Sequence, residues 1–268
     1  MMTWMETPNT RPEKIPEDSH WWFNTRTRGL LSVLDRYVAP ADNRRVLDVG
    51  CGAGNMMHHL ARYGRVVGVD NFAKPLMVCR QRGYDPQLAP AEALPYADNS
   101  FDLVALLDVV EHCTDDLQVL RECYRVCAPG GYIAITGPAF QWLWTDNDRV
   151  NGHKRRYTRA ELGRLLPTAG CTVQRISYAF FLVFPLAAGL LLLRRLSGRR
   201  QQVATPHQND DAYQVEMEPT NPLLNSILDG LGGVEAALIS HINLPVGSSL
   251  VAIAQKTREQ RDTGDIMP

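Results

Sequence analysis

Residues 46–55 combine a carboxylate with closely spaced glycines, a pattern typical of a ligand-binding turn. Asp48 lies at the end of an apolar run and is followed by Gly50, Gly52 and Gly54. Glycines there permit positive φ angles and let backbone N–H groups approach a ligand closely. A dinucleotide-binding loop would need a glycine at position 55, where this chain has Asn55, and Asp48 would repel a pyrophosphate. The loop therefore favours a cationic ligand.

A second acid, Asp70, ends the next apolar run at residues 66–69. A carboxylate in that place can accept hydrogen bonds from the 2′- and 3′-hydroxyls of a ribose. Taken alone, the glycines suit a tight structural turn and Asp70 suits a helix cap. Together they predict a site for a nucleoside that carries a positive charge.

A third group with chemical potential, Asp108-Val109-Val110-Glu111-His112, directly follows the apolar run 101–107. Because α/β sheets bind ligands at the carboxyl ends of their strands, we expect Asp108, Glu111 and His112 to be catalytic. Two carboxylates and an imidazole could hold Mg²⁺ or Zn²⁺, or one of them could take a proton from an acceptor hydroxyl. In a structural alternative, Glu111 and His112 only fix the turn between strand and helix.

A fourth group follows a further strand-like run. Trp142, Trp144 and Asp148 precede the string Gly-His-Lys-Arg-Arg-Tyr at 152–157. His153 is a predicted base because imidazole exchanges protons near neutral pH. Arg155 and Arg156 could bind a phosphate or carboxylate of the substrate. The alternative is a solvated basic loop that caps the next helix.

Apolar runs alternate with helical patterns along the chain, which indicates βαβ units. Strands are expected at 45–49, 65–69, 101–107, 132–136, 171–178 and 249–256. Helices are expected at 28–38, 55–63 and 73–82, after a cap at Thr114, and after the capping box Thr158-Arg159-Ala160-Glu161. His20-Trp21-Trp22-Phe23 either staples the first helix or covers a ligand. The sequence predicts an open, doubly wound α/β fold with a mostly parallel sheet and helices on both faces.

An apolar insertion interrupts this rhythm before the last strand, at about 180–245. Its first part, residues 179–193, has 15 uncharged residues, which as a helix extend roughly 22 Å, short of a hydrocarbon core about 30 Å thick. Four arginines follow and suit an anionic leaflet: Arg194, Arg195, Arg199 and Arg200. Residues 221–241 have an amphipathic helical spacing. We expect the insertion to lie on a membrane without crossing it, with a dimer contact or a protein-buried helix as the alternative.

Composition excludes several classes of protein. The chain has 268 residues and a formal charge of −1, so no global field attracts nucleic acid. Its six cysteines are scattered without a C-x-x-C pair, as in reduced cytosolic proteins, where most are buried. Residues 1–13 contain no apolar run, so no signal peptide is expected.

With these motifs the chain resembles the class I S-adenosylmethionine-dependent methyltransferases over about residues 44–137. The segment 91–102, Ala-Glu-Ala-Leu-Pro-Tyr-Ala-Asp-Asn-Ser-Phe-Asp, is similar to the segment before that family's fourth strand. The segment 125–131, Arg-Val-Cys-Ala-Pro-Gly-Gly, is similar to its turn into the fifth. The resemblance implies a Rossmann-like sheet of seven strands and S-adenosylmethionine as cofactor.

The resemblance also implies a set of cofactor-binding residues. They are Asp48, Gly50, Cys51, Gly52, Gly54, Asp70, Asn71, Ala91, Glu92 and Leu107. The glycine loop would surround the methionine part, Asp70 would hold the ribose, and Ala91 and Glu92 would lie along the adenine. Pro90 stands where an acid often contacts the adenine amino group, so Glu92 or a backbone carbonyl takes that contact. Arg26 and Arg28 could reach the cofactor carboxylate.

Two further similarities narrow the expected chemistry. The D-x-x-E-H string resembles the E-x-x-E-H string of the quinone-biosynthesis O-methyltransferases, which is associated with a divalent metal, although similar strings occur in metal-free methyltransferases. The Trp-Trp-Phe entry, the Gly-His-x-Arg-Arg-Tyr loop and the Phe-Pro-rich insertion together resemble bacterial methyltransferases associated with envelope lipids or glycans. That resemblance covers about 20–256. It implies O-methylation of a lipid-linked or amphipathic acceptor at the membrane surface.

The predicted organisation follows from these parts. Residues 1–43 form an N-terminal arm and cap helix, 44–179 and 246–257 the S-adenosylmethionine-binding domain, 180–245 the insertion, and 258–268 a polar tail. We expect a cytoplasmic enzyme, peripheral on the inner face of the membrane, with no nucleic-acid partner and an open oligomeric state. The alternatives are a soluble small-molecule methyltransferase that dimerises through the insertion and a non-catalytic cofactor-binding module.

Overall fold

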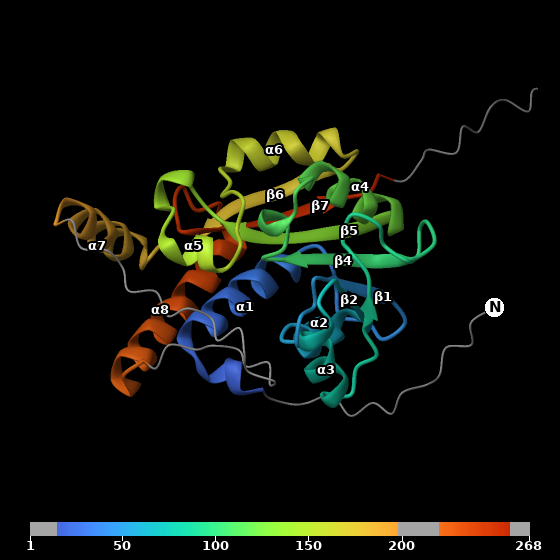
Figure 1. Cartoon of the computed structure of the whole chain (residues 1–268), viewed down its shortest axis with the longest axis horizontal. Coiled ribbons are helices and arrows are strands. Elements are labelled where there is room, and N and C mark those ends of the chain that lie inside the picture. The colour runs from blue at the N-terminus through green and yellow to red at the C-terminus, as the bar shows by residue number, and fades with distance from the viewer. Residues whose placement is uncertain (1–14, 198–219, 258–268) are drawn as a thin grey trace, which may run out of the picture.

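The computed structural model describes residues 15–197 and 220–257, and its centre is one seven-stranded sheet (Figure 1). The strands are β1 (Arg45–Val49), β2 (Arg65–Asp70), β3 (Gln87–Leu88), β4 (Phe101–Leu107), β5 (Cys127–Pro138), β6 (Thr172–Ala179) and β7 (Ser249–Gln255). Their order is β3-β2-β1-β4-β5-β7-β6. Only β7, among these strands, runs antiparallel to its neighbours β5 and β6. The predicted mostly parallel, doubly wound sheet is therefore confirmed.

Helices cover both faces of the sheet. The longer helices are α1 (Trp21–Leu34), α3 (Ala73–Gln81), α4 (Asp116–Val126), α6 (Arg159–Thr168), α7 (Phe184–Leu196) and α8 (Pro222–His241), and two short ones are α2 (Met57–Leu60) and α5 (Asp146–Val150). Single 3₁₀ turns are η1 (Pro16–Ser19), η2 (Ala61–Tyr63), η3 (Val110–His112) and η4 (Gln141–Leu143). Helices α4 and α6 pack on one face, above the sheet in Figure 1, and α1 and α8 pack on the other. Most of the buried apolar side chains lie in these two layers.

Several element boundaries differ from the prediction for identifiable reasons. Helix α1 begins at Trp21 rather than Arg28, because its first turn consists of aromatic residues that pack inward. The cap of α4 is Asp115 rather than Thr114, and its side chain accepts from the Gln118 N–H. Strand β3 has two exposed residues and no apolar run, so periodicity could not find it. The capping box at Thr158 and Glu161 is present.

The two helices of the insertion behave differently. Helix α8 crosses α1 so closely that a Cβ at Gly232 would lie 2.1 Å from Thr25 Oγ1. Its buried Glu235 accepts hydrogen bonds from the backbone N–H groups of Phe180 and Leu182, where β6 ends. Helix α7 instead projects from the domain (Figure 1). The domain boundaries proposed above stay predictions. The arm 1–14, the polar stretch 201–218 with Arg199 and Arg200, and the tail 258–268 lie outside the described residues.

Candidate active site

The glycine loop after β1 is held in shape by the next strand. The N–H groups of Gly50 and Cys51 both donate to the carbonyl of Val69, at 2.7 and 3.0 Å. Gly50, Gly52 and Gly54 have φ angles of +71°, +52° and +80°, in the left-handed region that side chains disfavour. A Cβ at Gly50 would lie 2.4 Å from Val109 Cγ2, whereas at Gly52 it would point into open space. Gly50 is thus needed for packing, and Gly52 borders the space that a ligand can occupy.

The structure brings Asp70 onto this loop. One carboxylate oxygen accepts from the Gly52 N–H at 2.9 Å, and the other accepts from the Phe72 N–H at 2.8 Å. Each oxygen keeps a further lone pair for a ligand hydroxyl. The Asp70 carboxylate is therefore fixed by the backbone in a position where it can bind a ribose.

Asp48 is also buried, but its environment is very different. It is 2% exposed, and its Oδ2 has no hydrogen-bond partner among the described residues. Burial raises the pKa of Asp48 to about 7, the nearby Asp70 charge adds to this, and Arg26 opposes it. A buried carboxylate without a partner is costly, so the arrangement favours a cationic group beside it.

The other predicted cofactor residues surround this centre. Cys51 is buried beneath the loop, Leu107 ends β4, and Asn71 is exposed just after Asp70. Ala91 and Glu92 are half-buried after β3, and the Glu92 carbonyl accepts from Gln118 Nε2 at 3.3 Å. Strand β3 pairs with β2 beside Asp70, and the role of Ala91 and Glu92 along an adenine stays a prediction.

Asp108 does not join the predicted catalytic cluster. It has a φ of +58°, forms an ion pair with Arg26, and accepts from Thr136 Oγ1 at 3.1 Å. The Arg26 guanidinium lies 4.9 Å from the Trp22 ring centroid, which fixes it from the other side. Asp108 is therefore held by Arg26 and Thr136, and among the described residues it does not belong to the group of ligand atoms that Glu111, His112 and His153 form.

Glu111 and His112 meet His153 instead. Their ligand atoms all lie within 4.8 Å of one another, and the rings of His112 and His153 are 4.7 Å apart, edge to face. Glu111 is fully buried, and neither carboxylate oxygen has a partner among the described residues. Burial, then the Asp108 charge, raises the pKa of Glu111 well above its usual range. Burial also lowers the pKa of His112. These three side chains could hold a divalent cation, and an ion would compensate the Glu111 carboxylate.

His153 is oriented by Asp148, a residue that the sequence placed nearby but without a role. Asp148 Oδ1 accepts from His153 Nδ1 at 2.9 Å, and Arg156 contacts both Asp148 oxygens through Nε and Nη2 at 2.7 and 2.9 Å. Burial would raise the pKa of Asp148, but the hydrogen bonds from His153 and Arg156 outweigh it and hold the pKa well below the usual range. Because Nδ1 is committed to Asp148, Nε2 is the nitrogen that can exchange a proton with an acceptor.

Comparison with known proteins agrees with this geometry. Residues 47–135 match the family model described as a methyltransferase domain. The protein named "Probable S-adenosylmethionine-dependent methyltransferase" of Mycolicibacterium smegmatis is 31% identical over 62% of this chain and 66% of its own length. The ubiquinone biosynthesis O-methyltransferase of Ralstonia nicotianae is 34% identical over 45% of this chain and 58% of its own.

A solved structure supports the fold. Phosphoethanolamine N-methyltransferase 2 of Haemonchus contortus, in complex with S-adenosyl-L-methionine, superposes with a TM-score of 0.54 at 18% identity, over 85% of this chain and 52% of that one. The chain belongs to the class I S-adenosylmethionine-dependent methyltransferases. It spans between one half and two thirds of the length of the first curated relatives that it matches.

S-adenosylmethionine fits the site that the methyltransferase domain presents. Its cationic methionine end suits Asp48, whose Oδ2 has no partner among the described residues, and its ribose suits Asp70. The open space beside Gly52 admits the atoms of the cofactor that lie closest to the loop backbone. The fit rests on three features of this chain rather than on the glycines alone.

All four arginines that were expected to bind ligands pair with carboxylates of the chain, Arg26 with Asp108 as described above. Arg28 pairs with Asp229 of α8, Arg155 pairs with Asp116 at 2.7 Å, and Arg156 pairs with Asp148. The partner carboxylates are either far away in the sequence or brought close by a turn of the loop, so the local sequence pattern could not predict these ion pairs. The aromatic entry has a packing role too, since Trp22 stacks on Phe180 at 5.9 Å, where β6 ends.

Proposed function

We propose that this protein transfers the methyl group of S-adenosylmethionine to an oxygen of a lipid-linked or amphipathic acceptor at a membrane surface. The observation that carries the proposal is the connection between the acceptor loop (residues 139–157), which holds His153 and Asp148, and the exposed apolar helix α7. The curated O-methyltransferase relative supports the choice of oxygen.

The reaction would use few protein groups. When bound, S-adenosylmethionine supplies a sulfonium whose methyl group is already electrophilic. The chain holds the cofactor through Asp48 and Asp70 and sets the acceptor oxygen in line with the methyl carbon. His153 Nε2 accepts the hydroxyl proton as the oxygen–carbon bond forms, and the carbon–sulfur electron pair passes to sulfur. Asp148 keeps the imidazole oriented and stabilises its charged form.

In a competing account, the same residues bind a divalent cation and His153 is not the base. Glu111, His112 and His153 would hold it, and the ion would lower the pKa of an acceptor hydroxyl. The two accounts differ in their response to a chelator. Full methyl transfer in excess chelator would leave His153 as the base, whereas loss that Mg²⁺ or Zn²⁺ restores would favour the metal.

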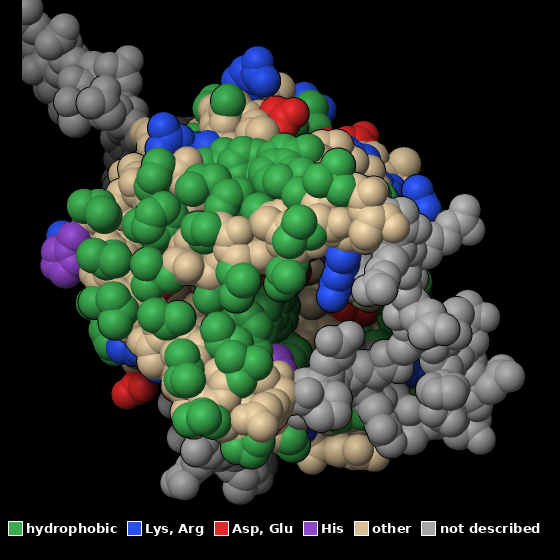
Figure 2. Space-filling view, turned by 90° about the vertical axis from the view of Figure 1, so that its left-hand side faces the viewer, with side chains coloured by type: hydrophobic (Ala, Val, Ile, Leu, Met, Phe, Trp, Pro, Cys, Tyr) green, Lys and Arg blue, Asp and Glu red, His purple; other side chains and the backbone are tan. Residues whose placement is uncertain are grey.

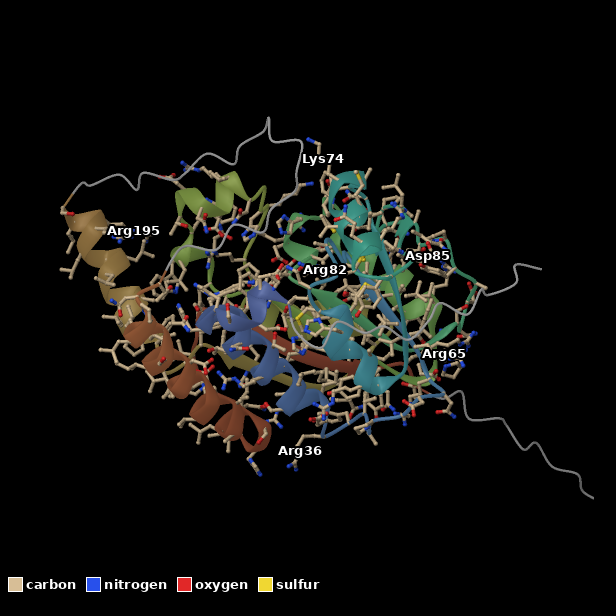
Figure 3. The ribbon with its side chains drawn as sticks, turned by 90° about the horizontal axis from the view of Figure 1, so that it is seen from below. Arg36, Arg65, Lys74, Arg82, Asp85 and Arg195 are labelled. Atoms are coloured by element: carbon tan, nitrogen blue, oxygen red, sulfur yellow. The ribbon has the colours of Figure 1, made fainter. Side chains whose placement is uncertain are left out.

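Aromatic contacts join the acceptor loop to α7. The rings of Phe140 and Trp142 lie 6.2 and 6.0 Å from Phe184, and Phe140 stacks on Tyr178 at 4.8 Å. At the other end of α7, Arg195 donates to the Trp144 carbonyl at 2.9 Å. In Figure 3 Arg195 lies across the molecule from Asp85 and Arg65. Whatever α7 binds is therefore next to the acceptor loop.

The exposed surface of α7 and α8 is apolar to an unusual degree. Figure 2 shows hydrophobic side chains gathered on this face around a hollow. The exposed members are Leu186, Leu190, Leu192, Leu193 and Leu196 of α7 and Leu223, Leu224, Ile227, Leu231, Val234 and Leu238 of α8. Large contiguous apolar patches of this kind mark protein or membrane contacts. Arg194 and Arg195 in the last turn of α7 favour an anionic leaflet as the partner.

The face fits a peripheral contact rather than a spanning one. Helix α7 has 13 residues, about 20 Å, which is too short to cross a bilayer. Helix α8 is long and apolar enough by length and composition. However, Asn225, Asp229 and Glu235 tie it to α1 and to the end of β6. Withdrawing α8 into a bilayer would break these contacts.

Vesicle flotation tests the membrane contact. Wild type should float with anionic vesicles at low salt, and Leu193→Glu and the pair Arg194→Gln with Arg195→Gln should each reduce the floating fraction several-fold. Met77→Glu is the matched control, because Met77 on α3 is 58% exposed against 64% for Leu193 and lies outside this face. Wild type that stays in the soluble fraction as a dimer, disrupted by Leu193→Glu, would assign the face to a second copy.

Transfer of a labelled methyl group tests the chemistry. Incubation with labelled S-adenosylmethionine and a bacterial lipid extract should give a labelled lipid of 14 daltons greater mass, and His153→Gln should slow its formation about 10²–10⁴-fold. Label confined to water-soluble acceptors would favour the small-molecule alternative.

A further inference from the structure

A second group of metal-ligating side chains lies outside the methyl-transfer residues. Asp18 belongs to the turn η1, and His58 and His59 are consecutive residues of α2. Asp18 Oδ2 lies 2.9 Å from His58 Nε2, and Asp18 Oδ1 lies 2.9 Å from His59 Nε2. The three ligand atoms lie within 4.8 Å of one another. Two segments about forty residues apart in the chain thus converge on one point.

We propose that Asp18, His58 and His59 form a site for a divalent transition metal of the zinc type. Two imidazole nitrogens and one carboxylate are ligands that Zn²⁺ prefers, and three protein ligands leave a position for water. In a tetrahedral site with bonds of about 2.0–2.1 Å, ligand atoms are roughly 3.3 Å apart. The distance of 2.9 Å from each Nε2 to its carboxylate oxygen is a few tenths of an ångström below this value, and the three ligand atoms all lie within 4.8 Å of one another.

The orientation and spacing of the two imidazole rings also favour a bound ion. Both imidazoles point Nε2 at a single carboxylate, and their ring centroids are only 3.8 Å apart, so charging both rings is unfavourable. Binding through His58 Nε2 moves its proton to Nδ1, and no described donor occupies Nδ1.

The position of the site indicates what the ion would do. Beside Asp18, the buried Glu17 pairs with Arg82 at 2.9 Å, and Arg82 donates to Asn55 at 2.7 Å and to the Ala53 carbonyl at 3.2 Å. Figure 3 labels Arg82 near the middle of the molecule, where α3 ends. The N-terminal turn is therefore fastened to the glycine loop. A metal ion would lock η1 onto α2 and so stabilise the loop that binds the cofactor.

Zinc titration of the full chain tests the site without any methyl acceptor. His153→Gln serves as the background, because Glu111, His112 and His153 form another candidate group among the described residues. After chelator treatment, this protein should bind one Zn²⁺ by competition with a chromophoric chelator, and its Tm should rise. Asp18→Asn, His58→Gln and His59→Gln should each weaken Zn²⁺ binding at least 100-fold and remove the Tm shift. His241→Gln, an exposed histidine of α8, should change neither.

Two outcomes would overturn the proposal. One is the absence of stoichiometric Zn²⁺ binding in the His153→Gln background, and the other is equal binding by the three ligand variants and the His241→Gln control. Circular dichroism shows whether each variant is folded, so a misfolded variant is replaced by its neighbour in the set. Failure here leaves the proposed methyl transfer untouched, since that function does not use Asp18, His58 or His59.

Discussion

The active site has a cofactor half, formed by the glycine loop with Asp48 and Asp70, and an acceptor half, formed by Glu111, His112 and the acceptor loop. The buried aspartates Asp48 and Asp148, one in each half, have opposite electrostatic surroundings. Asp48 is 2% exposed and Asp148 is 1% exposed, yet the pKa of Asp48 is raised to about 7 while that of Asp148 is held well below its usual range. Asp148 is surrounded by Arg156, His153 and the Thr145 N–H, whereas Asp48 has an oxygen without a partner among the described residues. Both side chains are almost fully excluded from solvent, and their partners differ.

The contrast shows how a single fold prepares two kinds of group. A carboxylate that the protein satisfies completely can orient another side chain, as Asp148 does for His153. A buried carboxylate that lacks hydrogen-bond or charged partners favours binding of a positively charged ligand, and it lowers the stability of the protein without that ligand. Asp48 therefore depends on a ligand for its partner, whereas Asp148 is satisfied by the protein.

The largest effect is expected at Gly52. Gly52→Val places a branched side chain at a φ of +52°, in the open space that the cofactor would fill, so S-adenosylhomocysteine binding should weaken at least about 100-fold, or 2.7 kcal/mol. Gly152→Val is the matched control, since Gly152 has a φ of +71° and equally open surroundings but belongs to the acceptor loop. Calorimetry should show near-normal binding for the control. Equal loss in both variants would mean that backbone strain, and not the cofactor space, explains the result.

Substituting asparagine at both aspartates should change stability in opposite directions. Asp148→Asn breaks a buried pair with Arg156 and should lower the free energy of unfolding by about 3 kcal/mol. The raised pKa of Asp48 means that its contribution to stability declines as pH rises from about 4 to 7 and stays low above that. Asp48→Asn should therefore stabilise the unliganded protein at pH 8, by up to roughly 4 kcal/mol. Denaturant unfolding at pH 8 measures both, and destabilisation by Asp48→Asn would contradict the comparison.

A smaller effect is expected in the pH dependence of cofactor binding. A cationic ligand favours the ionised form of Asp48, so binding below pH 7 requires loss of a proton. Affinity for S-adenosylmethionine, which carries the sulfonium charge that S-adenosylhomocysteine lacks, should fall by up to about tenfold per pH unit below pH 7 and be level above it. Titrations at pH 6 and 8 should differ by roughly tenfold for wild type and much less for Asp48→Asn. An equal pH dependence in both proteins would assign the proton to another group.

The cofactor half could be predicted from sequence because its determinants are local. The glycine loop, Asp70 and the flanking strands lie within one βαβ unit, and strand ends bring Asp70 to Gly52 without any long-range information. The strand β3 was missed because Gln87 and Leu88 are both exposed and carry no pattern.

The acceptor half was predicted in outline only. His153 was identified by type, but its partner Asp148 and the commitment of Arg156 depend on how a loop folds back on itself. Asp108 was expected among the catalytic residues and pairs with Arg26, which comes from a helix eighty-two positions earlier in the chain. Such pairs leave no periodic signal, and the same holds for Arg28 with Asp229.

The division of labour between the two halves is tested most directly by titrating S-adenosylhomocysteine into wild type, Asp70→Ala and His153→Gln. Wild type should bind one equivalent. Asp70→Ala removes the carboxylate that would hold the ribose and that fixes the Gly52 N–H, so its affinity should fall about 30- to 1,000-fold, or 2–4 kcal/mol. His153→Gln should bind within about twofold of wild type, because the acceptor half does not hold the cofactor. Equal affinity for wild type and Asp70→Ala, or an equal loss in both variants, would contradict the account.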